Sequence, residues 1–359
     1  MIGSRFVFAS LLAASSVVAC VDVDDGDLGE GREELSLASW TTTTNTHVTL
    51  SYAPATALLD GVEYQVFADD SGNALPSLTH DLYWRQCDAV SCTSTKRVPG
   101  QQSLGRVSLA AYIGYIYMVH PGDSDHTAVW FSRLDVTTGT WLTNSQLPFQ
   151  SLGGAPALAV FNNRLYMVGS REVEVYRRGV AVTTYPLWYS TMGPDEAWTP
   201  MVTINAQSGS PPSLAVLGST LYLAHRDGAA GEIVLQKLPL GGSWSAPARI
   251  PAGPSGAPIQ GDDVQLAAVN GYLHLVHHRW SGNYTYWTYN RGCDAFAPEV
   301  SLDGFNSSAN SLATGRNGTL VLNRMGMDSG VWPYTIYDWY VSRFVAPPAP
   351  VTVPQCGAL

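Results

Sequence analysis

The stretch LAVFNNRLYMVG (158–169) decides the fold, because a close copy of it, LAVLGSTLYLAH, recurs at 214–225. Each copy consists of a short apolar run, one or two residues that favour a turn, and a second apolar run. Asn162-Asn163 in the first copy and Gly218 in the second suit the positive φ of a tight hairpin. Each copy therefore predicts a pair of antiparallel strands.

Six such copies follow one another along the 359-residue chain, at 56–68, 109–120, 158–169, 214–225, 266–277 and 312–324. The column of the tyrosine in LYM is 47 to 56 residues apart from copy to copy and holds Tyr64, Tyr117, Tyr166, Tyr222, His274 and Val321. A repeat of this length built from strands is typical of a β-propeller. The sequence predicts an all-β, six-bladed β-propeller, with a seven-bladed ring as the alternative.

Two further strands follow the hairpin in most copies. The third is rich in aromatic residues, and its six versions are 82–86, 129–133, 187–191, 233–237, 285–289 and 334–339. The last copy has no fourth strand, whereas the β-branched segment 41–52 precedes the first copy without a partner. We expect this N-terminal strand to complete the last blade, which closes the ring and removes open sheet edges.

The N-terminus has the pattern of an export signal. Arg5 precedes an apolar run from Phe6 to Ala19, and Val17-Val18-Ala19-Cys20 resembles a bacterial lipobox. We expect a lipid on Cys20 that holds the exported protein in the bacterial cell envelope, at the outer membrane. The chain then divides into a signal peptide (1–19), the lipidated Cys20 with an acidic tether (20–40), the propeller (41–345) and a Pro-rich tail (346–359).

The charge of the chain limits the classes of partner that it can bind. The formal net charge is −10 and no basic patch is present, which argues against nucleic-acid binding.

Beyond Cys20 an even number of cysteines remains, as in exported chains with disulfides, and we expect the pairs Cys87–Cys92 and Cys293–Cys356. Three connectivities are possible. A zinc site is the alternative, but CxxC and HxxxH spacings are absent, so we expect neither a metal nor a cofactor.

Two sets of recurring side chains are candidates for binding a sugar. Third-strand tryptophans offer an aromatic face to the apolar side of a pyranose: Trp130, Trp188 and Trp287. Polar groups for the hydroxyls recur at or just after the second strands: His120, His225, His277, Arg171, Arg226, Arg279 and Arg324. A structural role remains the alternative for both sets, with tryptophans filling the blades and polar side chains hydrogen-bonding to carbonyls of neighbouring blades.

The phrase PALAVFNNRLYMV, followed by LWYSTM and AWTP, resembles the repeated unit of bacterial sugar-binding propellers. These include fucose-lectin-like propellers and sialidase-like repeat arrays, and the resemblance covers roughly 41–345. It implies a glycan or another surface ligand as the partner. We expect a monomeric, lectin-like, non-catalytic protein that contacts the membrane only through its lipid.

A sialidase-like glycoside hydrolase and a scaffold that binds a partner protein are the alternatives. A sialidase needs an arginine triad, a Tyr–Glu pair and an Asp acid. The segment nearest to an Asp-box, SRLDVTTGTW (132–141), has a different spacing, and no GxSxG elbow is present. Carboxylates and arginines that converge at the axis would favour the enzyme, and pockets between blades would favour the lectin.

Overall fold

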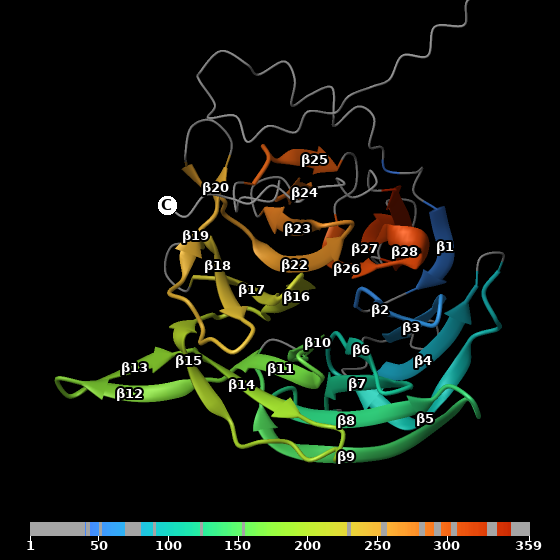
Figure 1. The fold of residues 1–359 in the computed structure, drawn as a ribbon, viewed down its shortest axis with the longest axis horizontal. Helices are drawn as coiled ribbons and strands as arrows, with labels where there is room; N and C mark the ends of the chain where they lie inside the picture. Colours follow the sequence, from blue (N-terminus) through green and yellow to red (C-terminus); the bar gives the residue numbers. More distant parts are fainter. Residues whose placement is uncertain are drawn as a thin grey trace, which may run out of the picture.

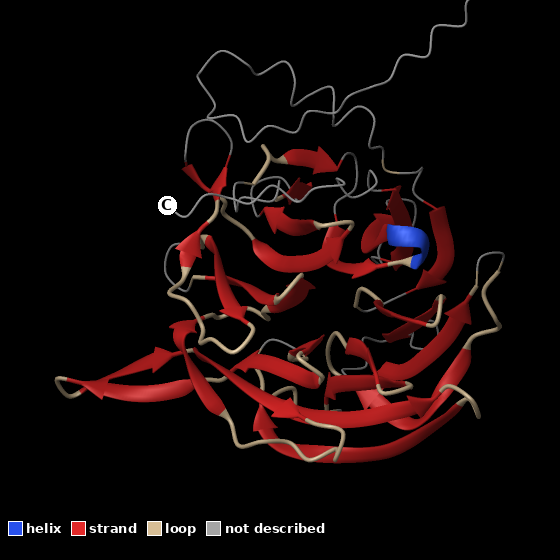
Figure 2. Ribbon diagram, in the orientation of Figure 1, coloured by secondary structure: helices blue, strands red, loops and turns tan. Residues whose placement is uncertain are grey.

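The computed structural model is a ring of six four-stranded antiparallel sheets around a central axis (Figure 1). It describes residues 40, 44–49 and 52–345, with gaps at 69–79, 89–90, 123–124, 153–154, 228–230, 253–256, 280–283, 291–295, 303–306 and 329–335. Strands make up nearly all of the described ring, together with one short 3-10 turn, η2 (Arg316–Gly318) (Figure 2). The predicted all-β, six-bladed propeller is confirmed.

The repeated phrase forms the two inner strands of every blade, numbered 1 to 6 along the chain. The innermost strands surround the axis in chain order: β2 (Ala55–Leu59), β6 (Ser108–Tyr112), β10 (Ala157–Phe161), β16 (Ser213–Leu217), β22 (Asp262–Val269) and β26 (Ser307–Thr314). The second strands pair with them: β3 (Val62–Ala68), β7 (Tyr115–Pro121), β11 (Arg164–Ser170), β17 (Thr220–Arg226), β23 (Tyr272–Arg279) and β27 (Thr319–Asp328). The ring closes because β2 also lies beside β26.

Two outer strands complete each sheet. The third strands are β4 (His80–Cys87), β8 (Ala128–Asp135), β14 (Pro186–Met192), β18 (Ile233–Pro239), β24 (Tyr284–Tyr289) and β28 (Ile336–Val345). The outermost strands are β5 (Lys96–Ser103), β9 (Thr140–Gln150), β15 (Val202–Gln207), β19 (Ala248–Arg249), β25 (Val300–Leu302) and, in blade 6, β1 (Thr44–Thr49). The pairing of β1 with β28 confirms that an N-terminal strand closes the last blade.

The turns between the inner strands have the backbone geometry that their residues suggest. Asn162 and Asn163 have φ of 49° and 53°, and Gly218 has φ of 59°. The equivalent turn of blade 5, Asn270-Gly271, has φ of 50° and 83°. Asparagine and glycine adopt this left-handed region at low cost, and the resulting tight turn matches the twist of the two strands that it joins.

The hydrophobic core lies between neighbouring blades. In the cluster shared by blades 2 and 3, Phe149 packs against Trp188 with ring centroids 5.5 Å apart, and Leu165 is fully buried beside them. Equivalent clusters follow between the other blades. No single repeat can bury these side chains, so the blades stabilise one another around the ring.

A buried carboxylate joins the first and last blades. Glu63 at the start of β3 is 0% exposed and accepts two hydrogen bonds of 2.7 Å from the Arg343 guanidinium of β28. The backbone N–H of Arg316 donates to the same carboxylate at 3.2 Å. Burial alone would raise the pKa of Glu63, but the hydrogen bonds and charges of Arg343 and Arg316 outweigh it and hold the pKa below its ordinary value. The seam of the ring therefore contains an ion cluster.

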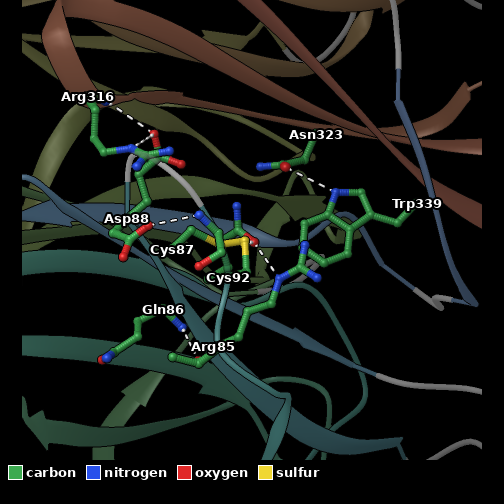
Figure 3. Close-up of a disulfide and its surroundings, with 12 residues drawn as sticks. Arg85, Gln86, Cys87, Asp88, Cys92, Arg316, Asn323 and Trp339 are labelled. Atoms are coloured by element: carbon green, nitrogen blue, oxygen red, sulfur yellow. Dashed lines mark hydrogen bonds and ion pairs between the residues drawn. A yellow bond between two sulfur atoms is a disulfide. The ribbon is translucent and has the colours of Figure 1, made fainter.

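The disulfide Cys87–Cys92 is confirmed and closes the turn after β4, with Cα atoms 3.9 Å apart (Figure 3). Beside it, the Arg85 guanidinium lies 4.2 Å from the ring centroid of Trp339, a residue of blade 6. The predicted pair Cys293–Cys356 and the lipidated Cys20 lie outside the described residues.

One element was not predicted from the sequence. β12 (Val173–Arg177) and β13 (Val180–Thr184) form a hairpin that projects from blade 3 (Figures 1 and 2). Tyr176 and Val180 on this hairpin are 71% and 63% exposed. A second small addition, β20 (Pro251–Ala252) with β21 (Ala257–Pro258), follows blade 4. The period of the repeat does not reveal such insertions, because they lengthen a loop without changing the order of the strands.

Candidate functional site

The two faces of the ring carry different kinds of connection. The inner strands begin on one face, near Ser108 and Ser213, and the connections between blades lie there; we call it the loop face. The opposite face carries the tight turns such as Asn162-Asn163; we call it the turn face. Because the second strands end at the loop face, the predicted histidines and arginines all lie toward it.

The predicted histidines are buried within their blades. His120, His225 and His277 are 2%, 1% and 0% exposed. The Nε2 of His225 lies 3.2 Å from Gln236 Oε1, and His277 contacts the carboxylate of Glu299. These contacts lie within one blade: Gln236 belongs to β18, which is next to β17, and Glu299 directly precedes β25, two strands away from β23.

Blade 3 has Gly169 in place of this histidine, and the structure supplies the reason. Gly169 pairs with Trp188 across β11 and β14. A Cβ on Gly169 would lie 2.7 Å from the Cζ2 atom of Trp188, closer than real carbon atoms approach. Blade 3 therefore has no side chain at this position of the second strand, which leaves room for the buried indole of Trp188.

We expect Gly169→Ala to lower the free energy of unfolding by about 1–3 kcal/mol, because the buried indole of Trp188 must shift to admit the methyl group. Chemical denaturation followed by tryptophan fluorescence measures the change. Gly179→Ala at the exposed hairpin tip, where a Cβ meets no atom within 4 Å, tests backbone conformation without a clash. A larger loss at Gly179 than at Gly169 would contradict the packing argument.

The predicted arginines form ion pairs within the protein or lie against its strands. Arg226 Nε lies 3.0 Å from Asp262 Oδ1 of the next blade, and Arg279 pairs with Glu299. Arg324 is 4% exposed and donates to Ser342 Oγ at 3.1 Å. Arg171 is half-buried at the base of the β12–β13 hairpin. The structure does not bring these four side chains to one point.

The predicted tryptophans differ in exposure. Trp188 and Trp287 are 1% and 2% exposed and belong to core clusters between blades. The ring centroid of Trp287 lies 4.8 Å from that of Phe344 of blade 6. Trp130 is half-buried. Of the three tryptophans, Trp130 is the one that exposes enough surface for a ligand to contact.

The axis of the ring is narrow. A cavity of about 100 Å³ lies there, and residues of all six blades line it, among them the residue directly before each copy of the repeated phrase: Ala55, Ser108, Ala157, Ser213, Gln265 and Ser311. The serine hydroxyls form hydrogen bonds between neighbouring blades: Ser108 Oγ accepts from Leu158 N at 3.2 Å, and Ser213 Oγ accepts from Leu266 N at 2.8 Å. Ligand pockets usually measure ~300–1,000 Å³, so the axial cavity is too small for a sugar ring.

An ion pair crosses this axis at the loop face. Arg106, which precedes blade 2, contacts the Asp263 carboxylate of the opposite blade 5 and donates to the carbonyl of Asn310 at 3.1 Å. Asp263 accepts a second hydrogen bond of 2.5 Å from the Asn310 backbone N–H. Asp263 has a φ of 50°, an uncommon value inside a strand, which its contacts on both oxygens stabilise. The charged groups at the axis therefore bind each other.

A larger pocket, of about 660 Å³, lies between blades 3 and 4. We call it the inter-blade pocket; its lining residues are Pro186, Thr203, Ile204, Asn205, Ala206, Gln207, His225, Asp227 and Pro247. β15, the outer strand of blade 3, supplies one wall, and His225 and Asp227 at the end of β17 supply another. Of the predicted ligand residues, His225 alone belongs to this lining.

His225 brings no positive charge to the pocket. Burial lowers the pKa of His225 below its ordinary value, although the nearby backbone of Arg226 and the Gln236 side chain act in the opposite direction. The Gln236 amide donates through Nε2 to Ser245 O at 2.8 Å, which leaves Oε1 facing His225. The imidazole therefore donates from Nε2 and stays neutral near pH 7.

A Tyr–Glu pair is present, but on the turn face. The Tyr117 hydroxyl donates to Glu196 Oε1 at 3.0 Å, and Arg133 contacts the same carboxylate. Burial raises the pKa of the Tyr117 hydroxyl. This pair lies at the end of the blade opposite to Arg106 and Asp263, so the described residues do not assemble arginines, a Tyr–Glu pair and an acid in one place.

No cluster of three or more histidine, cysteine or acidic side chains suits a metal ion in the part of the chain that the structure describes. Within the same residues, no helix has the length and apolar character to cross a bilayer.

Comparison with known proteins identifies the fold. The Trypanosoma rangeli sialidase is 12% identical over 83% of this chain, with a TM-score of 0.57. The same sialidase solved in complex with sialic acid also has a TM-score of 0.57, over 85% of the chain. The structure of YjhT is 12% identical, covers 83% of this chain and 95% of its own, and has a TM-score of 0.54. The fold is thus that of the sialidase-like β-propellers, as the sequence resemblance implied.

This chain spans 55% of the first sialidase chain. No family model matches the sequence, and no curated protein matches it significantly.

Sequence reasoning missed most of the inter-blade pocket. Thr203, Asn205 and Gln207 alternate along β15 and are exposed, whereas Ile204 between them is buried. This period-2 alternation was visible in VTINAQ (202–207), but it marks any outer strand with one solvated side. Nothing in the repeat indicates which outer strand borders a cavity.

Proposed function

We propose that this protein is a non-catalytic, lectin-like propeller that binds a glycan in the inter-blade pocket, and that a lipid on Cys20 holds it in the bacterial cell envelope. The observation that carries the proposal is the contrast between a 660 Å³ pocket between blades and a 100 Å³ cavity at the axis. Only the first has room for a sugar ring within the usual range of ligand pockets.

The chemistry of the pocket supports a polyhydroxylated ligand. Thr203, Asn205 and Gln207 provide both donors and acceptors, as sugar hydroxyls require. Pro186 and Pro247 provide apolar surface for the C–H groups of a ring. Such a site orients and holds a sugar without activating a nucleophile.

A sialidase-like glycoside hydrolase is the second candidate, and the axial charges are the observation in its favour. Arg106 and Asp263 meet at the axis, but each is occupied by the other and by Asn310. Arg226 and Arg279 are likewise paired with carboxylates of the chain. An enzyme of this type needs arginines free to bind the substrate carboxylate, so we favour the lectin.

A glycan array probed with the 41–359 fragment tests the proposal, with released sugar assayed in the same wells. The fragment contains all described strands of the ring, of which the first begins at Thr44, and among the described residues it lacks Trp40 alone. We expect binding without release. Asn205→Trp should fill the pocket and weaken binding at least tenfold, whereas Asn144→Trp, at an exposed asparagine of another outer strand, should leave it unchanged.

Each other outcome selects a different function. Released sugar would overturn the proposal in favour of the hydrolase. Binding that is insensitive to Asn205→Trp would move the site away from the inter-blade pocket. If the assays detected neither glycan binding nor released sugar, they would favour the third candidate, a scaffold that binds a partner protein on the surface of the ring.

A further inference from the structure

We infer that the inter-blade pocket selects sugars without a carboxylate, in the order amino sugar, neutral sugar, acidic sugar. This inference rests on the proposed glycan-binding function and names the chemical class of its ligand. It separates the chain from the sialidase that shares its fold and that was solved with sialic acid, a carboxylated sugar.

The lining of the inter-blade pocket carries a negative charge without a matching cation. Asp227 is exposed and is the one acidic residue among the lining residues, and no lysine or arginine belongs to that lining. His225 is buried and neutral and so adds no positive charge. A bound ligand therefore experiences a net negative pocket.

The two cations nearest to the lining in the sequence bind carboxylates that do not belong to it. Arg226 directly precedes Asp227 in the sequence, but its guanidinium lies against Asp262 of blade 5, with Nε 3.0 Å from Oδ1. Arg249 follows Pro247 closely and pairs with Glu232 at 2.8 Å. Both cations within two residues of the lining are thus bound to other carboxylates and do not compensate Asp227.

The strand β15 lines the pocket with neutral hydrogen-bonding side chains. Thr203, Asn205 and Gln207 all line the pocket and together provide neutral hydrogen-bond donors and acceptors. Amide and hydroxyl groups pair with sugar hydroxyls, whereas a carboxylate is bound best by the forked donors of arginine. These side chains suit a neutral or amino sugar.

The expected discrimination follows from Coulomb's law. Asp227 is exposed, so the dielectric around it is close to that of water. At that dielectric a ligand carboxylate about 3–4 Å away loses affinity by a factor of about five to ten, and a ligand ammonium gains up to a similar factor. Salt reduces both effects because Asp227 is exposed.

Two matched series of sugars test the inference: galactose, galactosamine and galacturonic acid, and the corresponding glucose series. Binding to the 41–359 fragment is measured by ligand-observed NMR at low ionic strength. We expect the uronic acid to bind about five- to tenfold more weakly than the neutral sugar and the amino sugar to bind more tightly. Asp227→Asn should bring the three members of a series within about threefold, and Asp227→Lys should reverse their order.

Asp60→Asn is the matched control. Asp60 is an exposed aspartate in a turn with φ of 50°, a conformation that asparagine also adopts, so the turn is kept while the same charge is removed elsewhere. This variant should leave the order of the sugars unchanged.

The outcomes separate the inference from the proposed function. A uronic acid that binds as tightly as its neutral partner, an order that Asp227→Asn leaves intact, or a carboxylated glycan as the best array ligand would overturn the inference and uphold glycan binding. Failure of every sugar and of the array would overturn the proposed function, and the inference with it.

Discussion

Glu63→Gln is expected to lower the free energy of unfolding of the 41–359 fragment by about 2–3 kcal/mol near pH 7. The substitution keeps the size of the side chain but removes the charge that two arginines bind: Arg343 through two hydrogen bonds of 2.7 Å and Arg316 through its backbone at 3.2 Å. Breaking a fully buried pair costs ~3–5 kcal/mol, and we expect less here because both arginine side chains reach solvent in part.

The free energy of unfolding that Glu63→Gln loses should depend on pH in a defined direction. The pKa of Glu63 is lower in the folded chain than in the unfolded chain, so the carboxylate stabilises the fold fully above its unfolded pKa of ~4.3. This stabilisation is lost as the pH falls through the lowered folded pKa. The difference between the wild type and Glu63→Gln should therefore narrow below about pH 4.

Urea denaturation at pH 7 and at pH 3.5 measures both effects. Glu172→Gln is the control, because Glu172 is an exposed carboxylate on the loop before the β12–β13 hairpin. Equal losses in the two variants at pH 7 would show that the seam between blades 1 and 6 does not depend on this ion cluster.

Trp188→Ala is expected to lower the free energy of unfolding by about 3–5 kcal/mol, the usual cost of removing a large aromatic side chain from a core. Trp188 is 1% exposed and packs against Phe149 of blade 2, so its removal leaves a cavity between two blades. The melting temperature followed by circular dichroism should fall by roughly 10 °C. The protein that remains folded should bind sugar as the wild type does.

This variant also decides between the two interpretations of the third-strand tryptophans. Trp130→Ala is the matched control, since Trp130 occupies the equivalent strand of blade 2 but is half-buried and should cost less. If Trp188→Ala kept its stability and lost sugar binding, the tryptophan would have to be reassigned from the core to the ligand site.

The fold was predictable because its signals are local and repeated. Two residues, Asn162 and Asn163, are enough to indicate the positive φ of their tight turn. Five residues on either side are enough to show the apolar pattern of the two strands that the turn joins. The missing fourth strand of the last copy and the unpartnered segment 41–52 together predicted the pairing of β1 with β28. The Cys87–Cys92 bond was predictable because so short a loop brings its two cysteines together in a hairpin turn.

The candidate site was not predictable to the same degree. His120, His225 and His277 recur in one column, and recurrence alone does not tell a ligand site from a contact that every blade needs. The structure buries all three. The inter-blade pocket instead depends on Asn205 and Asp227, which belong to different copies and to no column.

The sequence by itself determined the number of blades, the order of the strands and the strand that closes the ring, because each follows from periodicity and from hydrogen bonding between neighbours in the chain. The tertiary structure alone decided which charges meet and which space stays open. Arg106 pairs with Asp263 across the axis although 157 residues separate them, and the pocket opens where β15 of one copy meets the end of β17 of the next. Such contacts depend on how whole blades pack, and no local pattern of residues encodes that geometry.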